Sequence, residues 1–214
     1  MRLVSVNVGT PRTVEYRGRT VATGIFKQPV AGPVHVGATN LAGDGQADLR
    51  VHGGPHKAVY VYPLEHYAYW TPVLERRDLP FGFFGENLTV DGVNEDDVWI
   101  GDTLRAGSAV LQVSQPRTPC FKLALRTGIE DFPRQFTASG RTGFYLRVLE
   151  EGEVFVGAPM ERIARDPAGL PVGQVFQLRH GRAQGHDRAA LKRAAALGAP
   201  APGRRQAFDE ALRQ

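Results

Sequence analysis

The sequence predicts a mainly β fold with inserted helices, in which the strands close into a β-barrel and a small helical segment follows. Short β-like runs separated by Gly, Pro, Asn and Asp extend from residue 1 to about 163. The chain holds 25 Gly and 15 Pro, which indicates many turns. After Ala164 the β pattern stops. We therefore expect a barrel domain over residues 1–165 and a three-helix domain over residues 166–214.

Seven runs carry the strand prediction, and closing them into a barrel would remove exposed sheet edges. Turn residues place hairpins at 16–19 and 105–108, and alternation of apolar side chains from Leu104 to Val113 fits a half-buried strand pair. The runs are LVSVNVG, TVEYRGRTVATGIF, GPVHVG, AVYVYP, NLTVDG, DTLRAGSAVLQVS and FYLRVLEEGEVFVG.

Apolar spacing predicts three helices within the β region, over residues 64–77, 120–126 and 130–139. Pro63 and Pro119 stand at the expected starts of the first two. The tail segments GLPVGQVFQLRHG, DRAALKRAAALG and GRRQAFDEALRQ each resemble a short amphipathic helix. Helices this short are marginal alone, so we expect them to pack on one another or on the barrel.

Composition excludes several kinds of protein. The chain has 214 residues, a formal net charge of +4 and one cysteine. One cysteine forms no intramolecular disulfide and cannot supply the four ligands of an iron–sulfur cluster. No Rossmann fingerprint, signal-peptide pattern or apolar stretch of membrane-spanning length is present. We therefore expect a cytoplasmic protein without a membrane partner.

The single cysteine, Cys120, lies in the segment SQPRTPCFKL. Thr118 is suited to cap a helix and Pro119 to begin it, which would place the thiol in the first turn, near unpaired N–H groups. Arg117 and Lys122 add positive charge, so all three influences favour the thiolate, a nucleophile and soft metal ligand. Two other interpretations stay open: a small buried apolar residue, or the nucleophile of a hydrolase with a histidine base.

The candidate bases His52 and His56 belong to the glycine-rich segment DGQADLRVHGGPHKAV, residues 44–59. Such a loop can present N–H groups and a lysine to phosphate, although its spacing is not that of a P-loop. The segment Gly-Gly-Pro between the two histidines excludes a helical metal-binding face. Asn87, in another loop before a strand, could bond the backbone in a turn or reach a ligand.

Four ordered segments resemble the MOSC domain, a superfamily named for the C-terminal domain of molybdenum cofactor sulfurases. They are LAGDGQADLRVHGGPHKAVYVYP, FGENLTV, GDTLRAGSAVLQVSQPRTPCFKL and GRTGFYLRVLEEG. The resemblance covers residues 1 to about 163, and the tail is similar to the three-helix domain of the YiiM-like branch. The sequence departs from the family pattern at His56, where an acidic residue is more usual.

The resemblance implies a barrel that binds the molybdenum cofactor, a molybdopterin carrying a phosphate, with Cys120 as catalytic residue and sulfur ligand to the metal. Cationic side chains are expected at the phosphate and oxo groups, and Asn87 and Gln115 at the pterin edge. The predicted cofactor-binding residues are Lys27, Arg50, His52, Gly53, Gly54, Lys57, Asn87, Gln115, Arg117, Lys122 and Arg147.

The family chemistry implies a reductase that converts N-hydroxylated compounds, such as hydroxylaminopurine-type base analogues, to amines. The alternative is a non-catalytic carrier of the cofactor or of sulfur that uses the same thiol. Because the sequence has no iron–sulfur ligands and no flavin motif, a flavoprotein reductase is the expected electron donor, docked on the basic tail. The aromatic residues do not interleave with Lys or Arg as in RNA-binding motifs, so we expect no nucleic-acid partner. A homodimer is plausible on general grounds.

Overall fold

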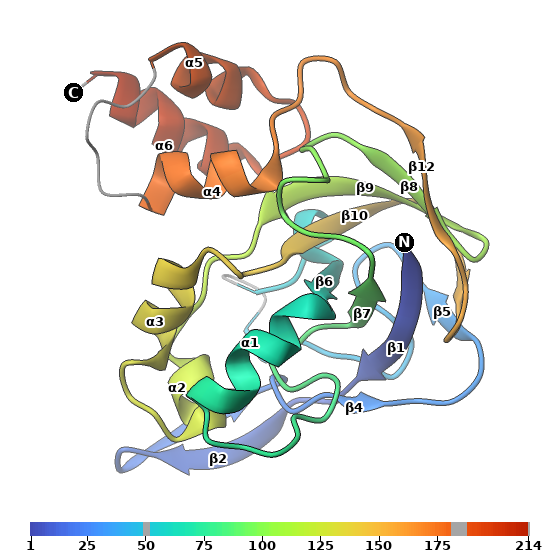
Figure 1. The fold of residues 1–214 in the computed structure, drawn as a ribbon, viewed down its shortest axis with the longest axis vertical. Coiled ribbons are helices and arrows are strands. Elements are labelled where there is room, and N and C mark those ends of the chain that lie inside the picture. Colours follow the sequence, from blue (N-terminus) through green and yellow to red (C-terminus); the bar gives the residue numbers. More distant parts are fainter. Residues whose placement is uncertain (49–51, 181–187, 214) are drawn as a thin grey trace.

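A mixed α/β fold rich in sheet is seen in the computed structural model, which describes residues 1–48, 52–180 and 188–213 (Figure 1). Eight strands form the main sheet in the order β12-β8-β9-β10-β6-β7-β1-β4. Their bounds are β1 Arg2–Val8, β4 Gln28–Pro29, β6 Val59–Pro63, β7 Leu88–Asp91, β8 Thr103–Ala106, β9 Ala109–Pro116, β10 Phe144–Glu150 and β12 Met160–Ala164. Every neighbouring pair is antiparallel except β6 and β7, which are parallel.

Two small sheets stand apart from the main one. Strands β2 (Arg12–Tyr16) and β3 (Arg19–Thr23) form a hairpin, and β5 (Val34–Val36) pairs with β11 (Gly152–Val154). The predicted hairpin turns at 16–19 and 105–108 are both confirmed. At the first turn Arg17 and Gly18 have φ of 54° and 69°, the positive values that a tight two-residue turn requires.

The main sheet nearly closes on itself, but its ladders stay open, which differs from the predicted closed barrel. Backbone hydrogen bonds join Leu3 to Gly157 and Ala158, and an isolated bridge joins Arg2 to Pro159, just before β12 begins. The N–H of Met160 also donates to the carbonyl of Met1, so the bonds on both sides of Pro159 are made and its missing N–H costs neither of them. Within the residues that the structure describes, the start of β1 and the segment that leads into β12 meet only over this short stretch, while β4 forms the other edge of the sheet.

The helices lie where the sequence predicted them, with shorter bounds. The predicted helices at 64–77, 120–126 and 130–139 correspond to α1 (Glu65–Val73), α2 (Lys122–Thr127) and α3 (Phe132–Ser139). A short 3₁₀ turn, η1, spans Pro55–Lys57. The tail forms the three predicted helices, α4 (Val172–His180), α5 (Arg188–Ala196) and α6 (Pro202–Arg213). None of the described helices is long and apolar enough to cross a membrane.

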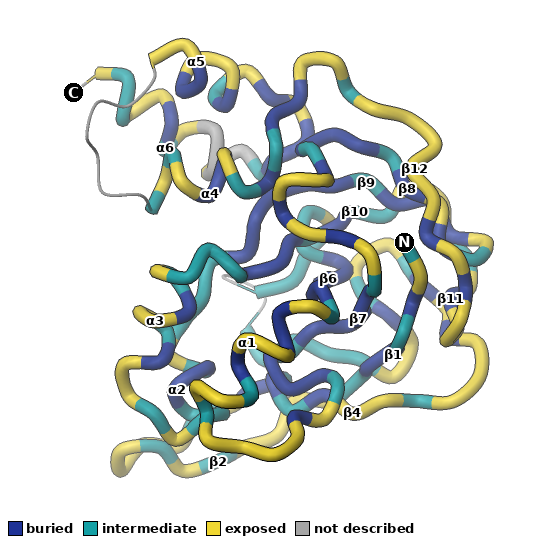
Figure 2. Tube along the Cα trace, viewed as in Figure 1, coloured by how far each residue is buried: buried dark blue, intermediate teal, exposed yellow. Residues whose placement is uncertain are grey.

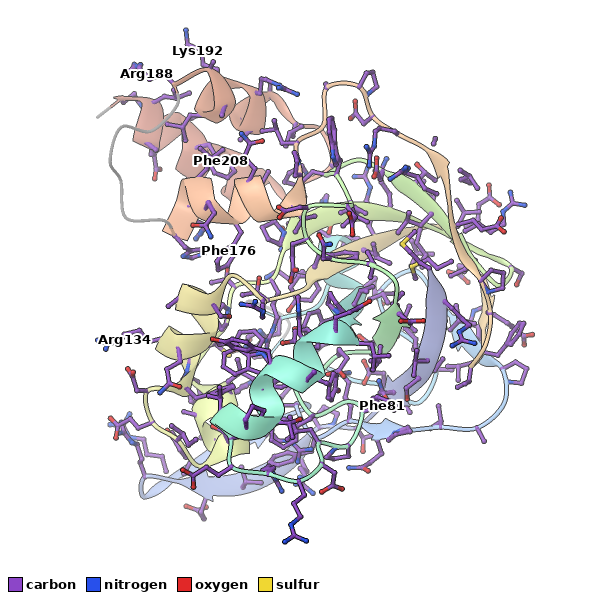
Figure 3. All side chains as sticks on the ribbon, in the orientation of Figure 1. Phe81, Arg134, Phe176, Arg188, Lys192 and Phe208 are labelled. Atoms are coloured by element: carbon purple, nitrogen blue, oxygen red, sulfur yellow. The ribbon has the colours of Figure 1, made fainter. Side chains whose placement is uncertain are left out.

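Two apolar clusters hold these elements together. The first fills the interior of the main sheet and continues into the tail through Val175, Leu191 and Phe208. Figure 3 shows Phe208 among the tail helices and Phe176 at the lower edge of α4, while Arg188 and Lys192 lie at the outer surface of the tail. The second cluster is largely aromatic and packs α1 and α3 against β6, as the dark-blue stretches of these elements show in Figure 2.

Candidate functional site

A pocket opens where five loops meet beside β6, β10 and the start of α2. It encloses about 670 Å³ of space, counting the solvent at its mouth. Segments far apart in the sequence build it, so the fold alone brings them together. The lining residues are Thr23, Gly24, Ile25, Lys27, Gly45, Gln46, Ala47, His52, Gly53, Lys57, Tyr60, Gly85, Asn87, Arg117, Thr118, Cys120, Lys122 and Tyr145.

Arg117 brings an unpaired charge to this pocket. Its side chain is only 6% exposed and lies over the rings of Tyr60 and Phe136, 4.8 and 5.4 Å from their centroids. Its Nη1 is buried without a hydrogen-bond partner, and no carboxylate of the described residues forms a salt bridge with it. A buried charge is costly unless it is paired. Because Arg117 also lines the pocket, its positive charge makes the pocket suited to an anionic ligand.

Replacing Arg117 by methionine should separate binding from stability. Methionine keeps an apolar side chain of similar length, so the unfolding free energy should change by less than about 1 kcal/mol or rise. Affinity for inorganic phosphate, measured by calorimetric titration, should fall roughly tenfold or more, the usual range for a lost charge-assisted hydrogen bond. Urea unfolding gives the stability. Large destabilisation with unchanged phosphate affinity would mean that Arg117 serves only the fold.

Cys120 is half-buried in the pocket wall, and its Sγ lies 4.0 Å from Nε2 of His52. The predicted position in the first helical turn is wrong: α2 begins at Lys122 with Phe121 as its N-cap, so the thiol precedes the helix. The carbonyl of Cys120 accepts the N–H of Leu123 instead. The thiol is therefore placed by the loop after β9 and faces a histidine, which suits either metal ligation or a Cys–His pair.

Burial, together with the nearby Lys122, Lys57 and Arg117, lowers the pKa of His52 from 6.5 to about 4. The imidazole is therefore neutral at pH 7. Next to Sγ it can take part in a hydrogen bond without adding charge to the pocket.

Stability of the metal-free protein should therefore fall as the pH is lowered from about 6.5 to about 4. Over this range His52 is protonated in the unfolded chain but stays neutral in the folded protein, so acid favours unfolding. Urea unfolding at several pH values should show a flatter profile for His52→Gln. His35→Gln, at an exposed position, is the control and should keep the wild-type slope. An unchanged slope in His52→Gln would contradict the assignment.

Lys27 is buried beside Asp44, with which it forms a salt bridge, and the side chain of Asp44 is fully buried. The carboxylate also accepts the N–H of Gly9 at 3.0 Å and the amide of Asn87 at 2.9 Å. Asn87 in turn accepts the N–H of Tyr60 and donates to the carbonyl of Asn7. Lys27 and Asn87 thus lie in the pocket wall, but their polar groups are occupied by the protein, which leaves Asn87 poorly placed to read a pterin edge.

The structure brings most of the predicted residues together. Lys27, His52, Gly53, Lys57, Asn87, Arg117, Lys122 and Cys120 all line the pocket. Gly53 and Gly54 have φ of 80° and 79°, conformations that favour glycine at both positions, although Gly54 is outside the lining. Arg50 lies outside the described residues.

Two predicted residues fall elsewhere. Gln115 is 1% exposed and lines a narrow hollow between β9 and the tail, with Val175, Arg179 and Phe208. Successive side chains of a strand point to opposite faces, and neighbouring Ser114 instead bonds the carbonyls of His56 and Tyr145. Arg147 lies in β10 opposite Gln112 and does not line the pocket.

The helical tail touches two of the loops that build the pocket. His180 of α4 lies 3.3 Å from the hydroxyl of Thr118, two residues before the cysteine. Nδ1 of His56 lies 3.1 Å from the carbonyl of Ala199, between α5 and α6. His56, where the family pattern usually has an acid, thus contacts the tail rather than the pocket. Outside the pocket, Arg193 of α5 donates a hydrogen bond to the carbonyl of Gly169, which precedes α4.

Sequence reasoning did not select several residues that line the pocket, such as Tyr60 and Tyr145, or Asp44, which lies outside the lining. Asp44 orders Lys27 and Asn87, while the rings of Tyr60 and Tyr145, 5.3 Å apart, form part of the wall. Asp44 belongs to the glycine-rich segment already noted, but nothing local reveals that its partner is 17 residues away. In the sequence, Tyr60 and Tyr145 cannot be distinguished from other aromatic residues of β-strands.

A sheet-rich α/β fold with a pocket lined by a single cysteine can be compared with known protein families. The MOSC domain matches residues 48–161, more than half of the chain. The chain therefore belongs to the MOSC domain family, and the sequence-based recognition is confirmed.

Among its relatives, YflK of Bacillus subtilis is 50% identical over 170 residues, which are 79% of this chain and 76% of that protein. YiiM of Escherichia coli is 41% identical over 143 residues, 66% of this chain and 64% of YiiM. The crystal structure of YiiM from Geobacillus stearothermophilus has a TM-score of 0.80 at 38% identity and covers 99% of this chain and 98% of its own. A protein of Gibberella moniliformis named Reductase is 35% identical over 69% of this chain, which spans 27% of that longer protein.

Proposed function

We propose that this protein binds the molybdenum cofactor in the described pocket and reduces N-hydroxylated compounds to amines. The observation that carries the proposal is one pocket lined by a half-buried thiol and by a buried guanidinium that has no carboxylate partner among the described residues. Membership of the MOSC family supports the cofactor, and the relative named Reductase supports the class of reaction. The substrate class follows from the chemistry that the family resemblance implies.

The residues of the pocket fit a phosphorylated pterin that carries a soft metal. Arg117 offers a buried donor without a partner, and Lys122 adds positive charge in the lining. Cys120 offers the protein's single thiolate ligand, the type that soft metals prefer. Lys27 is already neutralised by Asp44 and serves the structure of the wall. When bound, the cofactor supplies two-electron redox chemistry.

The proposed reaction breaks one N–O bond. An N-hydroxylamine, two electrons and two protons give the amine and one water, so the substrate is reduced and an external donor is oxidised. A flavoprotein reductase that contacts the exposed face of the tail, around Arg188 and Lys192, would supply the electrons (Figure 3). The chain's own residues bind and orient the reactants, and the neutral His52 ring lies beside the reacting centre without adding charge.

The test is turnover by protein produced in a host that makes molybdopterin. With dithionite as reductant, molybdenum-loaded protein should convert 6-hydroxylaminopurine to adenine, and metal-free protein should not. Chromatography of the products and elemental analysis measure the two quantities. Bound molybdenum without turnover would overturn the reductase and favour the alternative, a carrier of the cofactor or of sulfur.

A further inference from the structure

Cys120 lies in the wall of two hollows, not one. Besides the cationic pocket, it lines a second hollow between the β2–β3 hairpin and the segment that leads through α2 to α3. This second hollow encloses about 1560 Å³, counting the solvent at its mouth. In Figure 1 the hairpin crosses beneath α2 at the lower edge of the molecule. A group held at the sulfur can thus be approached from a side that the anionic ligand does not occupy.

The second hollow has an aromatic wall. Phe121, next to the cysteine, is 50% exposed although it is large and apolar. Its ring lies 6.1 Å from that of Tyr16 in the hairpin, with an angle of 29° between their planes. Other large apolar side chains of the described residues are similarly exposed, but Phe121 lies next to Cys120 and lines a hollow, where an aromatic ring can stack on a flat ligand.

The charges around the second hollow exclude some ligands. Arg17 and Arg19 line it, and its single acidic lining residue, Glu130, is paired with Arg17. A cationic ligand therefore finds no free carboxylate in this lining, while a neutral or electron-rich ring meets cations and π faces. The Arg17–Glu130 pair joins the hairpin to the segment before α3 and is exposed, so it restrains the hairpin only weakly.

We propose that this second hollow is the substrate site, in which a neutral, flat aromatic N-hydroxylated compound stacks on Phe121 beside Tyr16, with its N–O group toward Cys120. This inference rests on the proposed reductase function and states where the substrate of that reaction binds. The preference for aromatic substrates follows from the two rings. Aliphatic hydroxylamines gain little from these rings and should bind less tightly.

Binding of 2-aminopurine, a fluorescent aromatic amine of the product class, tests the site without relying on catalysis. Its fluorescence should be quenched on titration with molybdenum-loaded wild-type protein. Phe121→Ala should weaken the affinity on the order of tenfold, as expected for loss of one stacking partner, and Phe121→Trp should restore it. Tyr69→Ala is the control, because Tyr69 is an exposed aromatic residue of α1 that lines neither hollow.

The outcomes separate the two proposals. Absence of quenching by the wild type, or equal affinity of Phe121→Ala and Tyr69→Ala with matching circular dichroism, overturns the substrate site, whether or not the protein is a reductase. A selective loss in Phe121→Ala supports the site. If that loss occurs but the loaded protein reduces no N-hydroxylated compound, the reductase function fails while the aromatic binding site stands.

Discussion

Replacing Cys120 by serine is expected to reduce bound molybdenum per chain at least about tenfold and to abolish reductase activity. A hydroxyl is a harder and weaker ligand for a soft metal than a thiolate, and even changes outside the ligand set commonly cost about 10–100-fold in metal affinity. Because Cys120 is only half-buried, the unfolding free energy should stay within about 1 kcal/mol of the wild-type value. Elemental analysis, a turnover assay and urea unfolding measure the three quantities.

Thr118→Ser is the matched control for that substitution, because Thr118 lines the same pocket two residues away and serine keeps the hydroxyl that faces His180. It should retain the molybdenum. Equal metal content in Cys120→Ser and the wild type would show that the sulfur is not a ligand, and the account of the site would fail. Urea unfolding shows whether any loss of molybdenum in Cys120→Ser comes from the missing ligand or from a protein that no longer folds.

The second large effect is on stability. Asp44→Asn should lower the unfolding free energy by about 3–5 kcal/mol at pH 7, because it leaves the ammonium group of Lys27 buried without a counter-charge. Asparagine is nearly isosteric and can still accept the N–H of Gly9, but its amide group then faces the donating amide of Asn87, so the effect includes the loss of that hydrogen bond besides the loss of charge. Urea unfolding gives the value, and a change under about 1 kcal/mol would contradict the role assigned to the pair.

The pH dependence of the same variant provides its control. Burial lowers the pKa of Lys27 below 10.5, and the Asp44 carboxylate opposes that shift in the wild type. Without the carboxylate, the folded variant releases the Lys27 proton at a lower pH than the unfolded chain does. Raising the pH from 7 toward 10.5 should therefore restore part of the lost stability in Asp44→Asn. The double variant Asp44→Asn, Lys27→Met should recover stability at pH 7.

Local patterns in the sequence predicted the parts of the fold that depend on neighbours along the chain. The turn residues around Gly18 and Gly107 placed both hairpins, and apolar spacing placed the three tail helices. Sheet closure depends instead on which strand ends meet. The bridge between Arg2 and Pro159 joins residues that are far apart along the chain, and no local pattern reveals that they are partners.

The candidate site could be predicted in part for a similar reason. Motif resemblance selected Cys120, His52 and Arg117, which the structure brings into one pocket. Residue type alone could not tell that the polar groups of Asn87 are occupied, or that Gln115 points toward the tail. Hydrogen-bond partners and strand faces decide such questions, and both depend on contacts between distant segments.

X-ray absorption at the molybdenum edge tests the central claim most directly, that the thiol of Cys120 binds the metal of a cofactor held in this pocket. The account predicts that the loaded wild-type protein shows a sulfur ligand in addition to those of the pterin, and that this ligand is missing from whatever metal Cys120→Ser retains. The same sulfur coordination in both proteins would contradict it.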